Sequence, residues 1–468
     1  MNVVAEKDSL FSSMPERKAV VTLAIPTVIS QIITVIYNMA DTFFVGQLGD
    51  PDQVAAATLA MPLFMFMTAI ANLFGIGGAS LISRCLGANE REKASRCSSF
   101  CVWTAVAAAF LYGISLIVIL PTLLPILGAN SGTWKYSSEY IFWTIGIGAV
   151  PTVLNPELAH LVRAEGYSKQ AGFGVSFGGI LNIGLDPLFI FVFRMEITGA
   201  AIATMLSNAA AVVYFFCFIH KIRNVSTITV SPKRYTLKDH IPGEVLAVGL
   251  PSFIISMMAT ISNTVLNKII STCSNEAVAG MGIAKKIDLL AFAIAQGMTQ
   301  GTLPLIGYNY TSGNRKRMMS VIRTLLFDCL AVSLAGMATL LFTAAPITRL
   351  FIDNAETVRY GRTFLRIICL ACPTTAVNFF VITVFQATGK KIQPIILSLL
   401  RKGTVDVPLM FLFDRLMGIS GIAWATPAAD VIALVVSIAL AIPYFKKLRM
   451  RQIEAAPKKP AAKTADRV

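Results

Sequence analysis

Long apolar stretches separated by short polar stretches run through almost the whole chain. The hydrocarbon core of a bilayer is about 30 Å thick, and about 20 residues of α-helix are enough to cross it. Each apolar stretch is at least that long, so each is predicted to form a membrane-spanning helix. The twelve predicted segments are residues 19–46, 54–80, 97–120, 137–160, 170–193 and 198–220 in the first half, and 245–271, 277–306, 318–345, 361–387, 391–414 and 420–445 in the second half.

The composition agrees with a membrane protein. Of the 468 residues, 55% are hydrophobic and only 14% are charged, whereas an ordinary soluble domain has about 25% charged residues. The apolar stretches are also too long for the strands of a membrane β-barrel, which alternate over about ten residues. We therefore predict an all-α polytopic membrane protein, and the composition excludes a cytosolic enzyme, a secreted disulfide scaffold and a fibrous protein.

The positions of the basic residues predict the orientation of the chain in the membrane. The net charge of +15 would suggest a nucleic-acid partner in a soluble protein, but here Lys and Arg gather in the two terminal regions and in the loops after even-numbered segments. Cytoplasmic loops of membrane proteins carry such an excess. Both termini are therefore predicted to be cytoplasmic, in a multi-pass protein of the plasma membrane that binds no nucleic acid.

Three pairs of similar stretches indicate that the chain contains two copies of one unit. Each half would have six helices, an even number, so both halves would enter the membrane in the same direction. A parallel repeat implies a pseudo-twofold axis along the membrane normal, with a cavity between the halves. The pairs are LAIPTVISQIITVIYN (23–38) with VGLPSFIISMMATISN (248–263), GANEREK (87–93) with SGNRKRM (312–318), and ITGAAIATM (197–205) with ISGIAWATP (419–427).

The predicted fold thus has twelve transmembrane helices in two pseudo-symmetric six-helix lobes around a central cavity. The longest polar connection separates the lobes, and the end of the chain is rich in Lys, Ala and Pro, a composition typical of disorder. The predicted parts are a cytoplasmic amino-terminal segment (1–18), an N-lobe (19–220), a cytoplasmic linker (221–243), a C-lobe (244–446) and a disordered basic tail (447–468).

Two carboxylates in the first half are candidates for an ion site, because carboxylates at membrane depth are costly unless they have a role or a partner. Asp41 lies toward the end of the first segment and Asp186 lies in the fifth. Asn182 precedes Asp186 by four residues and shares its helix face, and Thr204 adds a hydroxyl from the sixth segment. Oxygen atoms of these four side chains could bind a proton or a small hard cation. The alternative is that Asp41 lies at the water interface and Asp186 pairs with a distant basic residue.

The other intramembrane carboxylates have simpler explanations. Lys285 lies three residues before Asp288 on the same face, so an internal ion pair is as good an explanation for Asp288 as a substrate contact. Asp406 can pair with Lys402, four residues earlier. Structural roles are favoured for Asp328, Asp406 and Asp430.

The sequence contains no phosphate-binding motif of the form G-x-x-x-x-G-K-[ST], so ATP is not the energy source within this chain. A membrane enzyme would need a compact set of catalytic side chains, and the three scattered histidines do not supply one. We expect a protein that is not an enzyme and that has no cofactor.

Several of these features together resemble the multidrug and toxic compound extrusion (MATE) transporters. The resemblance extends from Met14 to about Lys447. It implies an antiporter that expels amphipathic, often cationic, compounds in exchange for protons or sodium ions. It also implies that Asp41, Asn182, Asp186 and Thr204 form the coupling-ion site of the amino lobe. The motifs are the twelve-helix duplication, Pro26 in a first helix that ends with Asp41, N-x-x-x-D-P at Asn182–Pro187, and PLIGYNYTSGN at Pro304–Asn314.

The sequence departs from the family in the second half. Many members carry a Glu in the middle of the seventh helix that helps to form a sodium site, and Asn263 falls about there in this chain. This difference moves the predicted coupling site to the amino lobe and favours protons over sodium. Pro26 interrupts the hydrogen bonding of its helix and would let it bend when Asp41 is neutralised. Asn38, Asn263 and Asp288 are candidate side chains of the substrate cavity.

A lipid or lipid-linked-sugar flippase is the alternative function, because such proteins share the duplicated plan. Flippases of this kind line the cavity with basic residues, and the sequence offers candidates. As a transporter, the protein is expected to act as a monomer in the lipid bilayer on small hydrophobic or cationic substrates. The candidate basic residues are Lys268, Lys285, Lys286, Arg401 and Lys402.

Overall fold

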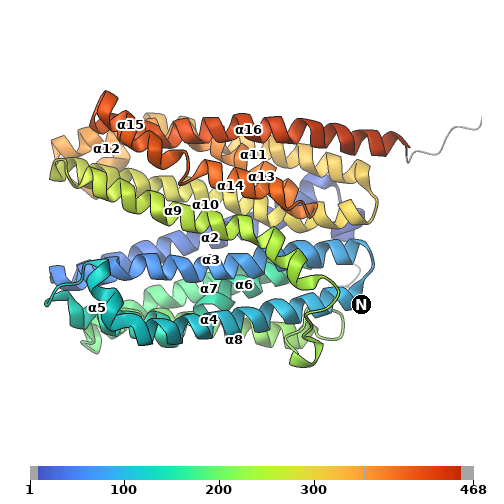
Figure 1. The fold of residues 1–468 in the computed structure, drawn as a ribbon, viewed down its shortest axis with the longest axis horizontal. Coiled ribbons are helices and arrows are strands. Elements are labelled where there is room, and N and C mark those ends of the chain that lie inside the picture. The colour runs from blue at the N-terminus through green and yellow to red at the C-terminus, as the bar shows by residue number, and fades with distance from the viewer. Residues whose placement is uncertain (1–8, 353, 455–468) are drawn as a thin grey trace, which may run out of the picture.

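The structure is a computed structural model of the chain, and it describes residues 9–352 and 354–454. These residues form a bundle of long helices without strands (Figure 1). The helices of the first half are α2 (Glu16–Gly46), α3 (Pro51–Gly87), α4 (Arg91–Leu127), α5 (Thr133–Ile141), α6 (Ala149–Ala164), α7 (Ser168–Pro187) and α8 (Glu196–Ile222). Those of the second half are α9 (Ile241–Ile270), α10 (Asn275–Thr311), α11 (Arg315–Phe351), α12 (Ala355–Ile368), α13 (Cys372–Ala387), α14 (Ile392–Arg401), α15 (Asp406–Met417) and α16 (Ile419–Glu454).

Each of the twelve predicted segments corresponds to one helix or to a pair of consecutive helices. Within the described residues, nine helices are long and apolar enough to cross a membrane, and the bent pair formed by Thr133–Ile147 and Ala149–Ala164 makes a tenth span. Two of the twelve predicted segments are not among these ten spans. One is α10, which carries several charged residues, and the other is formed by the short helices α14 and α15 together. The prediction of an all-α polytopic membrane protein is confirmed.

Not every segment is the single helix that was predicted. The prediction of one helix over 391–414 is wrong, because α14 ends at Arg401 and α15 begins at Asp406. Gly403, between them, has a φ of +85°, a left-handed conformation that favours glycine. Segments 137–160 and 361–387 are likewise composite. The apolar pattern does not reveal such breaks, because the residues on both sides are equally apolar.

Several helices extend beyond the predicted apolar boundaries. Helices α3, α4, α10 and α11 have 37 residues each and are therefore about 55 Å long, more than the bilayer core requires. Helix α16 continues to Glu454, so the prediction of a disordered tail from residue 447 is wrong for residues 447–454. Residues 455–468 of that tail, and residues 1–8, lie outside the described residues.

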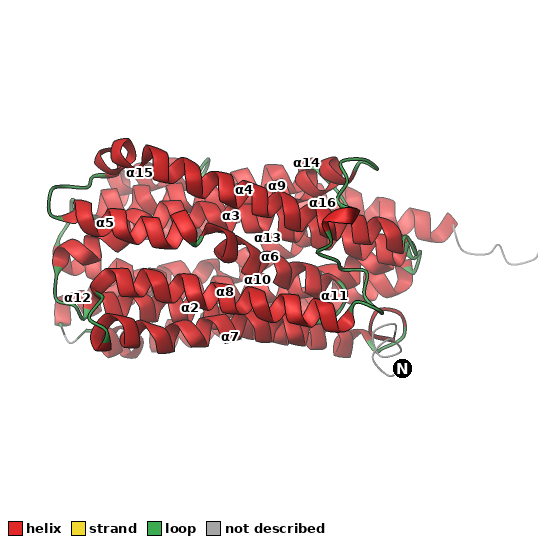
Figure 2. Ribbon diagram, turned by 90° about the horizontal axis from the view of Figure 1, so that it is seen from below, coloured by secondary structure: helices red, strands yellow, loops and turns green. Residues whose placement is uncertain are grey.

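The helices form two lobes, one below the other in Figure 1. Figure 2 shows the bundle from below, so the two lobes overlap along the line of sight, and each layer seen there contains helices of both lobes, such as α3 and α9 in one and α2 and α12 in the other. Helices α2–α8 make the N-lobe and α9–α16 the C-lobe. In the N-lobe α2 packs against α7 and α3 against α6, and in the C-lobe α9 packs against α14 and α10 against α13. Between the lobes, α3 contacts α9 and α2 contacts α10. The first helix of each lobe thus meets the second helix of the other, as a pseudo-twofold axis requires.

The contact between the lobes, here called the interlobe interface, is tight where backbones touch. A Cβ atom at Gly249 of α9 would overlap the carbonyl oxygen of Leu73 of α3, and one at Gly297 of α10 would lie 2.7 Å from the Cα atom of Val28. Helix α2 begins, and α3 ends, at the end of the bundle that holds the amino terminus, here called the terminal end (Figure 1). The glycine contacts lie in the half of the bundle nearest to it.

The amino-terminal segment (residues 9–14) lies across the two lobes at the terminal end. Phe11 is buried and stacks on Tyr308 of α10, with 5.0 Å between ring centroids. Its carbonyl oxygen accepts a hydrogen bond of 2.9 Å from Nε of Arg317 in α11. On the N-lobe side, a Cβ atom at Gly166 would lie 3.0 Å from the Phe11 ring. The segment therefore connects the α6–α7 turn of the N-lobe to α10 and α11 of the C-lobe.

The connection between the lobes is fastened to the N-lobe. It follows the end of α8, contains a short 3₁₀ helix (Pro232–Arg234) and leads into α9. Ser99 donates a hydrogen bond of 2.8 Å to the carbonyl oxygen of Ser231, and Nε1 of Trp103 donates one of 3.0 Å to that of Val230. These bonds hold the middle of the connection against α4.

Candidate functional site

Three of the predicted site residues meet in the core of the N-lobe. Helices α7 and α8 pack closely because α7 is rich in glycine; a Cβ atom at Gly178 would lie 3.1 Å from the Cβ atom of Ala211. The Nδ2 atom of Asn182 donates hydrogen bonds to Oδ1 of Asp186 (3.2 Å) and to Oγ1 of Thr204 (3.3 Å). None of the three side chains is more than 6% exposed. The spacing of four residues between Asn182 and Asp186 thus places both on one face.

Asp41 on α2 belongs to the same cluster. Tyr37, one helical turn before Asp41, packs on α7, where a Cβ atom at Gly179 would lie 2.9 Å from the tyrosine ring, and Oδ1 of Asp41 is buried and accepts no hydrogen bond. Tyr37 and Tyr140 are also within electrostatic range of Asp41. Sequence reasoning missed both tyrosines. Tyr37 could have been found, because it precedes Asp41 by four residues, whereas Tyr140 comes from α5 and gave no signal.

The cluster presents oxygen atoms that have no donor. Oδ1 of Asp41, Oδ2 of Asp186 and Oδ1 of Asn182 are buried without a hydrogen-bond partner. No Lys or Arg among the described residues forms an ion pair with either carboxylate. A buried carboxylate without a partner binds a proton or a cation, because the isolated charge is too costly in a dry environment. The arrangement is therefore suited to binding and releasing one of these.

A chain of amides continues from the cluster toward the terminal end. Nδ2 of Asn208 donates to the backbone oxygen of Thr204 (2.9 Å), and Nδ2 of Asn155 donates to Oδ1 of Asn208 (2.8 Å). Both amides are buried. Sequence reasoning missed them, although Asn208 follows Thr204 by one helical turn. They extend the polar interior of the N-lobe from α8 to α6.

The other two predicted residues of α2 are engaged locally. Helix α2 runs without interruption through Pro26, and a Cβ atom at Gly172 of α7 would lie 2.6 Å from the carbonyl oxygen of Pro26. Helix α7 therefore packs directly on α2 at the proline. Nδ2 of Asn38 donates to the carbonyl oxygen of Thr34 at 2.8 Å, so this amide bonds within its own helix.

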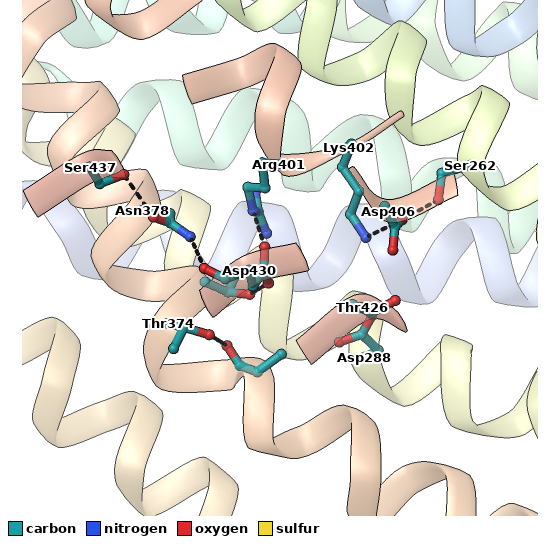
Figure 3. A network of polar contacts seen from close by, with 12 residues as sticks. Ser262, Asp288, Thr374, Asn378, Arg401, Lys402, Asp406, Thr426, Asp430 and Ser437 are labelled. Atoms are coloured by element: carbon teal, nitrogen blue, oxygen red, sulfur yellow. Dashed lines mark hydrogen bonds and ion pairs between the residues drawn. The ribbon is translucent and has the colours of Figure 1, made fainter. Parts of the chain in front are cut away.

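The C-lobe contains a network of polar contacts of a different kind (Figure 3). Nε of Arg401 donates to Oδ1 of Asp430 at 2.9 Å, and both side chains are only 2% exposed. Thr375 donates to the other carboxylate oxygen, and the guanidinium of Arg401 lies 4.3 Å from the ring centroid of Phe379. Asp430 is thus fully paired. The pair was missed because Arg401 and Asp430 are far apart in the sequence.

Asp406 is paired in the same network. Nζ of Lys402 lies 3.4 Å from Oδ2 of Asp406, which confirms the predicted pair. Ser262 of α9 donates to the same carboxylate oxygen (Figure 3). Asn263, the next residue and a predicted cavity residue, is exposed on another face of α9.

Asp288 takes part in an ion pair. Nζ of Lys285 lies 3.8 Å from its Oδ2 atom and 3.4 Å from Oγ1 of Thr426. The structure thus shows the internal pair, one of the two explanations considered for Asp288. Of the candidate basic residues of a flippase cavity, Lys268 and Lys286 are exposed, and the other three bind carboxylates.

The two lobes therefore differ in how their buried carboxylates are neutralised. In the C-lobe, Asp406 and Asp430 each have a cation supplied by the chain itself. In the N-lobe, Asp186 has only a hydrogen bond from the neutral amide of Asn182, and Oδ1 of Asp41 is buried without a hydrogen-bond partner. An exchangeable ion can bind only where no fixed cation already occupies the place, so the N-lobe cluster is the candidate ion site.

Comparisons with known proteins agree with this architecture. The family model described as MatE matches residues 26–188 and 251–412, two matches that begin 225 residues apart. The multidrug export protein MepA of Staphylococcus aureus (strain NCTC 8325 / PS 47) is 29% identical to the chain over 426 residues, which cover 90% of the chain and 92% of the relative. The two ranges matched by the family model confirm the duplication that the sequence predicts.

Solved structures share the fold. One is described as the outward-facing conformation of a multidrug resistance MATE family transporter of the MOP superfamily; its TM-score is 0.85 at 24% identity, covering 95% of this chain and 98% of that one. Another is a MOP superfamily transporter from Pyrococcus furiosus, described as having a binding pocket of reverse polarity. Its TM-score is 0.84 at 24% identity, covering 94% of this chain and 98% of that one.

Proposed function

The chain belongs to the MatE family, and we propose that it is a secondary-active antiporter that exports amphipathic, often cationic, compounds in exchange for protons. It acts in the plasma membrane with both termini in the cytoplasm, as a monomer and without a cofactor. The similarity to multidrug export proteins over nine-tenths of the chain supports the substrate class. The twelve-helix count is consistent with the family.

One observation carries the coupling mechanism: the N-lobe carboxylates Asp41 and Asp186 each have a buried oxygen atom without a hydrogen-bond partner, and no fixed cation pairs with them. Binding of an ion from one side of the membrane neutralises the pair, and its release on the other side restores the charge. Because the charged and neutral forms differ greatly in the cost of burial, the ion biases the lobe toward one conformation. Coupling requires such a difference in binding between two states.

Protons suit the cluster better than sodium ions. Asn182 presents its amide nitrogen to Asp186 and Thr204, which leaves three unpaired oxygen atoms in the cluster. Hard metal cations take about six oxygen ligands, whereas a proton needs a single carboxylate oxygen. The Asn263 found where many sodium-coupled members have Glu points the same way.

The interlobe interface supports alternating access. It joins the lobes in the half of the bundle near the terminal end, which is the cytoplasmic end by the distribution of basic residues. This conformation is then closed toward the cytoplasm, and export would alternate it with one in which α3 and α9 separate there.

The flippase alternative is less well supported, because it requires basic side chains that are free to bind an anionic lipid. Lys285, Arg401 and Lys402 instead bind Asp288, Asp430 and Asp406. Their charges are neutralised within the C-lobe.

The decisive test uses proteoliposomes loaded with a fluorescent cationic dye. We expect an inward pH gradient to drive dye release by the wild type, and a sodium gradient at constant pH to have little effect. Asp41→Asn and Asp186→Asn should reduce pH-driven release to the level of empty liposomes while dye binding is retained. Without an ionisable carboxylate at these positions, the proton has no place to bind.

Asp414→Asn is the matched control, because it removes the same charge from a residue outside the cluster, and it should transport like the wild type. Wild-type rates in both Asp41→Asn and Asp186→Asn would refute the site. Dye release driven only by the sodium gradient would show that the coupling ion is sodium and not the proton. An absence of dye transport under either gradient would favour the flippase.

A further inference from the structure

Four arginines line one cavity at the end of the bundle opposite the terminal end. The cavity has a volume of about 510 Å³ and is lined by residues of α11 and α12; α12 lies at that end of the bundle in Figure 1. Arg349 comes from the last turn of α11, and Arg359, Arg362 and Arg366 come from α12. Residues spaced by three and four positions share a helix face, so the three side chains of α12 follow one stripe. This cavity is here called the arginine pocket.

The arginine pocket is an exception to the charge distribution of the rest of the chain. Basic residues are sparse in the predicted external loops, as the positive-inside tendency requires. Four of them in one place repel each other unless an anion lies between them. Their grouping therefore points to a negatively charged ligand.

The protein itself neutralises the pocket only in part. Arg359 forms an exposed ion pair with Glu356 at 3.2 Å, and Nε of Arg366 donates to the carbonyl oxygen of Leu341 at 3.0 Å. Within residues 9–352 and 354–454, no carboxylate forms an ion pair with Arg349, Arg362 or Arg366. Arg401, inside the C-lobe, instead forms a buried ion pair with Asp430.

Apart from Thr363, the rest of the pocket wall is apolar. Ala345 and Ile367 contribute to its wall. Phe342, Ala345 and Arg349 are spaced by three and four residues on α11 and so share one face, with Phe342 about 10 Å deeper in the membrane than Arg349. Phe342 is 83% exposed. The site thus offers cations at its rim and an apolar surface below, the arrangement that fits an anionic amphiphile.

We propose that the arginine pocket binds the headgroup phosphate of an anionic phospholipid, with an acyl chain lying along Phe342. Guanidinium groups bind phosphate by paired hydrogen bonds of fixed geometry, and Arg349 and Arg362 face the same cavity from two helices. The lipid joins α11 to α12 and supplies the missing negative charge. The assignment of this end to the outer leaflet rests on the proposed orientation, but the binding itself does not depend on transport.

The test measures lipid binding to the purified protein by native mass spectrometry and by thermal unfolding. The ligands are phosphatidylglycerol, phosphatidylcholine and inorganic phosphate, each at the same phosphate concentration. We expect phosphatidylglycerol to bind the wild type and to raise its Tm, and the Arg349→Gln/Arg362→Gln variant to bind it at least about tenfold more weakly. Phosphatidylcholine and inorganic phosphate should have little effect.

Two further variants control for charge and folding. Arg91→Gln/Lys316→Gln removes the same charge from exposed residues at the terminal end and should bind like the wild type. Arg349→Lys/Arg362→Lys keeps the charge but removes the paired hydrogen bonds, and should show intermediate binding. Equal phosphatidylglycerol binding by the wild type and the Gln variant would overturn the proposal, and so would an equal Tm shift with inorganic phosphate or with phosphatidylcholine.

Discussion

At the scale of single residues, buried carboxylates in this protein are stabilised in two ways. Asp430 is held by the guanidinium of Arg401 at 2.9 Å, and its negative charge is permanently matched. Asp186 is held only by the neutral amide of Asn182 at 3.2 Å. A fixed ion pair keeps its charge in every conformation, whereas a carboxylate with neutral neighbours can gain and lose a proton. We therefore propose a structural role for the C-lobe pair and a coupling role for the N-lobe cluster.

A double-mutant cycle on Arg401 and Asp430 should show that this pair is structural. Arg401→Met leaves a buried carboxylate unpaired, and Asp430→Asn leaves a buried guanidinium unpaired; each should cost about 3–5 kcal/mol of stability. The double variant should cost much less than the sum of the two, because no unpaired charge remains. Thermal or denaturant unfolding in detergent measures the cycle.

The matched comparison is Arg359→Met, which breaks an exposed ion pair and should cost less than about 1 kcal/mol. Additive effects of Arg401→Met and Asp430→Asn would show that the two side chains do not depend on each other, contrary to the structure.

The residues of the N-lobe cluster could be predicted where a local spacing linked them, as for Asn182 and Asp186. Membrane depth alone singled out Asp41, because a carboxylate is rare there. The Arg401–Asp430 pair could not be predicted, since its members come from helices whose relative position depends on the packing of the whole C-lobe. Sequence spacing carries information only about neighbours on the same helix.

At the scale of helices, backbone contacts between the lobes depend on glycine. Replacing Gly249 by Ala would place a Cβ atom against the carbonyl oxygen of Leu73 and so push α9 away from α3. We expect this variant to have a lower Tm and a wider interlobe interface at the terminal end. Gly243→Ala is the control on the same helix, because a Cβ atom there meets no other atom within 4 Å.

Gly243→Ala should leave the Tm unchanged or raise it slightly, since Ala favours a helix by roughly 1 kcal/mol over Gly. Thermal unfolding of both variants in one detergent makes the comparison. Equal Tm values would mean that α3 and α9 do not touch as closely as the structure has them.

The positions of helices along the chain followed from the apolar pattern, but their interruptions did not. The span predicted over 391–414 contains no charged residue between Lys391 and Arg401, and the break after Arg401 depends on Gly403 in a left-handed conformation. Asp406 then begins α15 against Lys402 and Ser262. The contacts of Asp406 with Lys402 and Ser262 fix the position of the break. Because Ser262 belongs to another helix, the sequence of the segment 391–414 alone does not predict this contact.

At the scale of the whole molecule, the duplication could be predicted because the two halves retain similar stretches in the same order at a near-constant offset. The packing of α3 on α9 and of α2 on α10 could not, because it depends on which surfaces of the lobes meet. The position of the amino-terminal segment was also beyond prediction. Its polar sequence suggested only a cytoplasmic extension, and yet Leu10 and Phe11 are buried between helices.

This placement predicts that the amino-terminal segment holds the lobes together at the terminal end. Phe11 contacts Tyr308 of the C-lobe and the turn at Gly166 of the N-lobe, so its ring is buried only while the lobes are closed there. Phe11→Ala removes that burial, which is worth about 3–5 kcal/mol for a core Phe, and should shift the equilibrium toward the open conformation. A distance between spin labels at Asn89 and Ser312, exposed in the corresponding turns of the two lobes, reports the change.

In a variant without native cysteines, the wild-type segment should give a short label distance, and Phe11→Ala should add a second, longer population. Phe110→Ala is the matched control, because that ring is 57% exposed and belongs to α4 of the N-lobe, away from the amino-terminal segment. It should keep the short distance alone. If Phe11→Ala also kept the short distance alone, closure at that end would depend on the contacts of α3 with α9 and of α2 with α10, and the amino-terminal segment would only cover them.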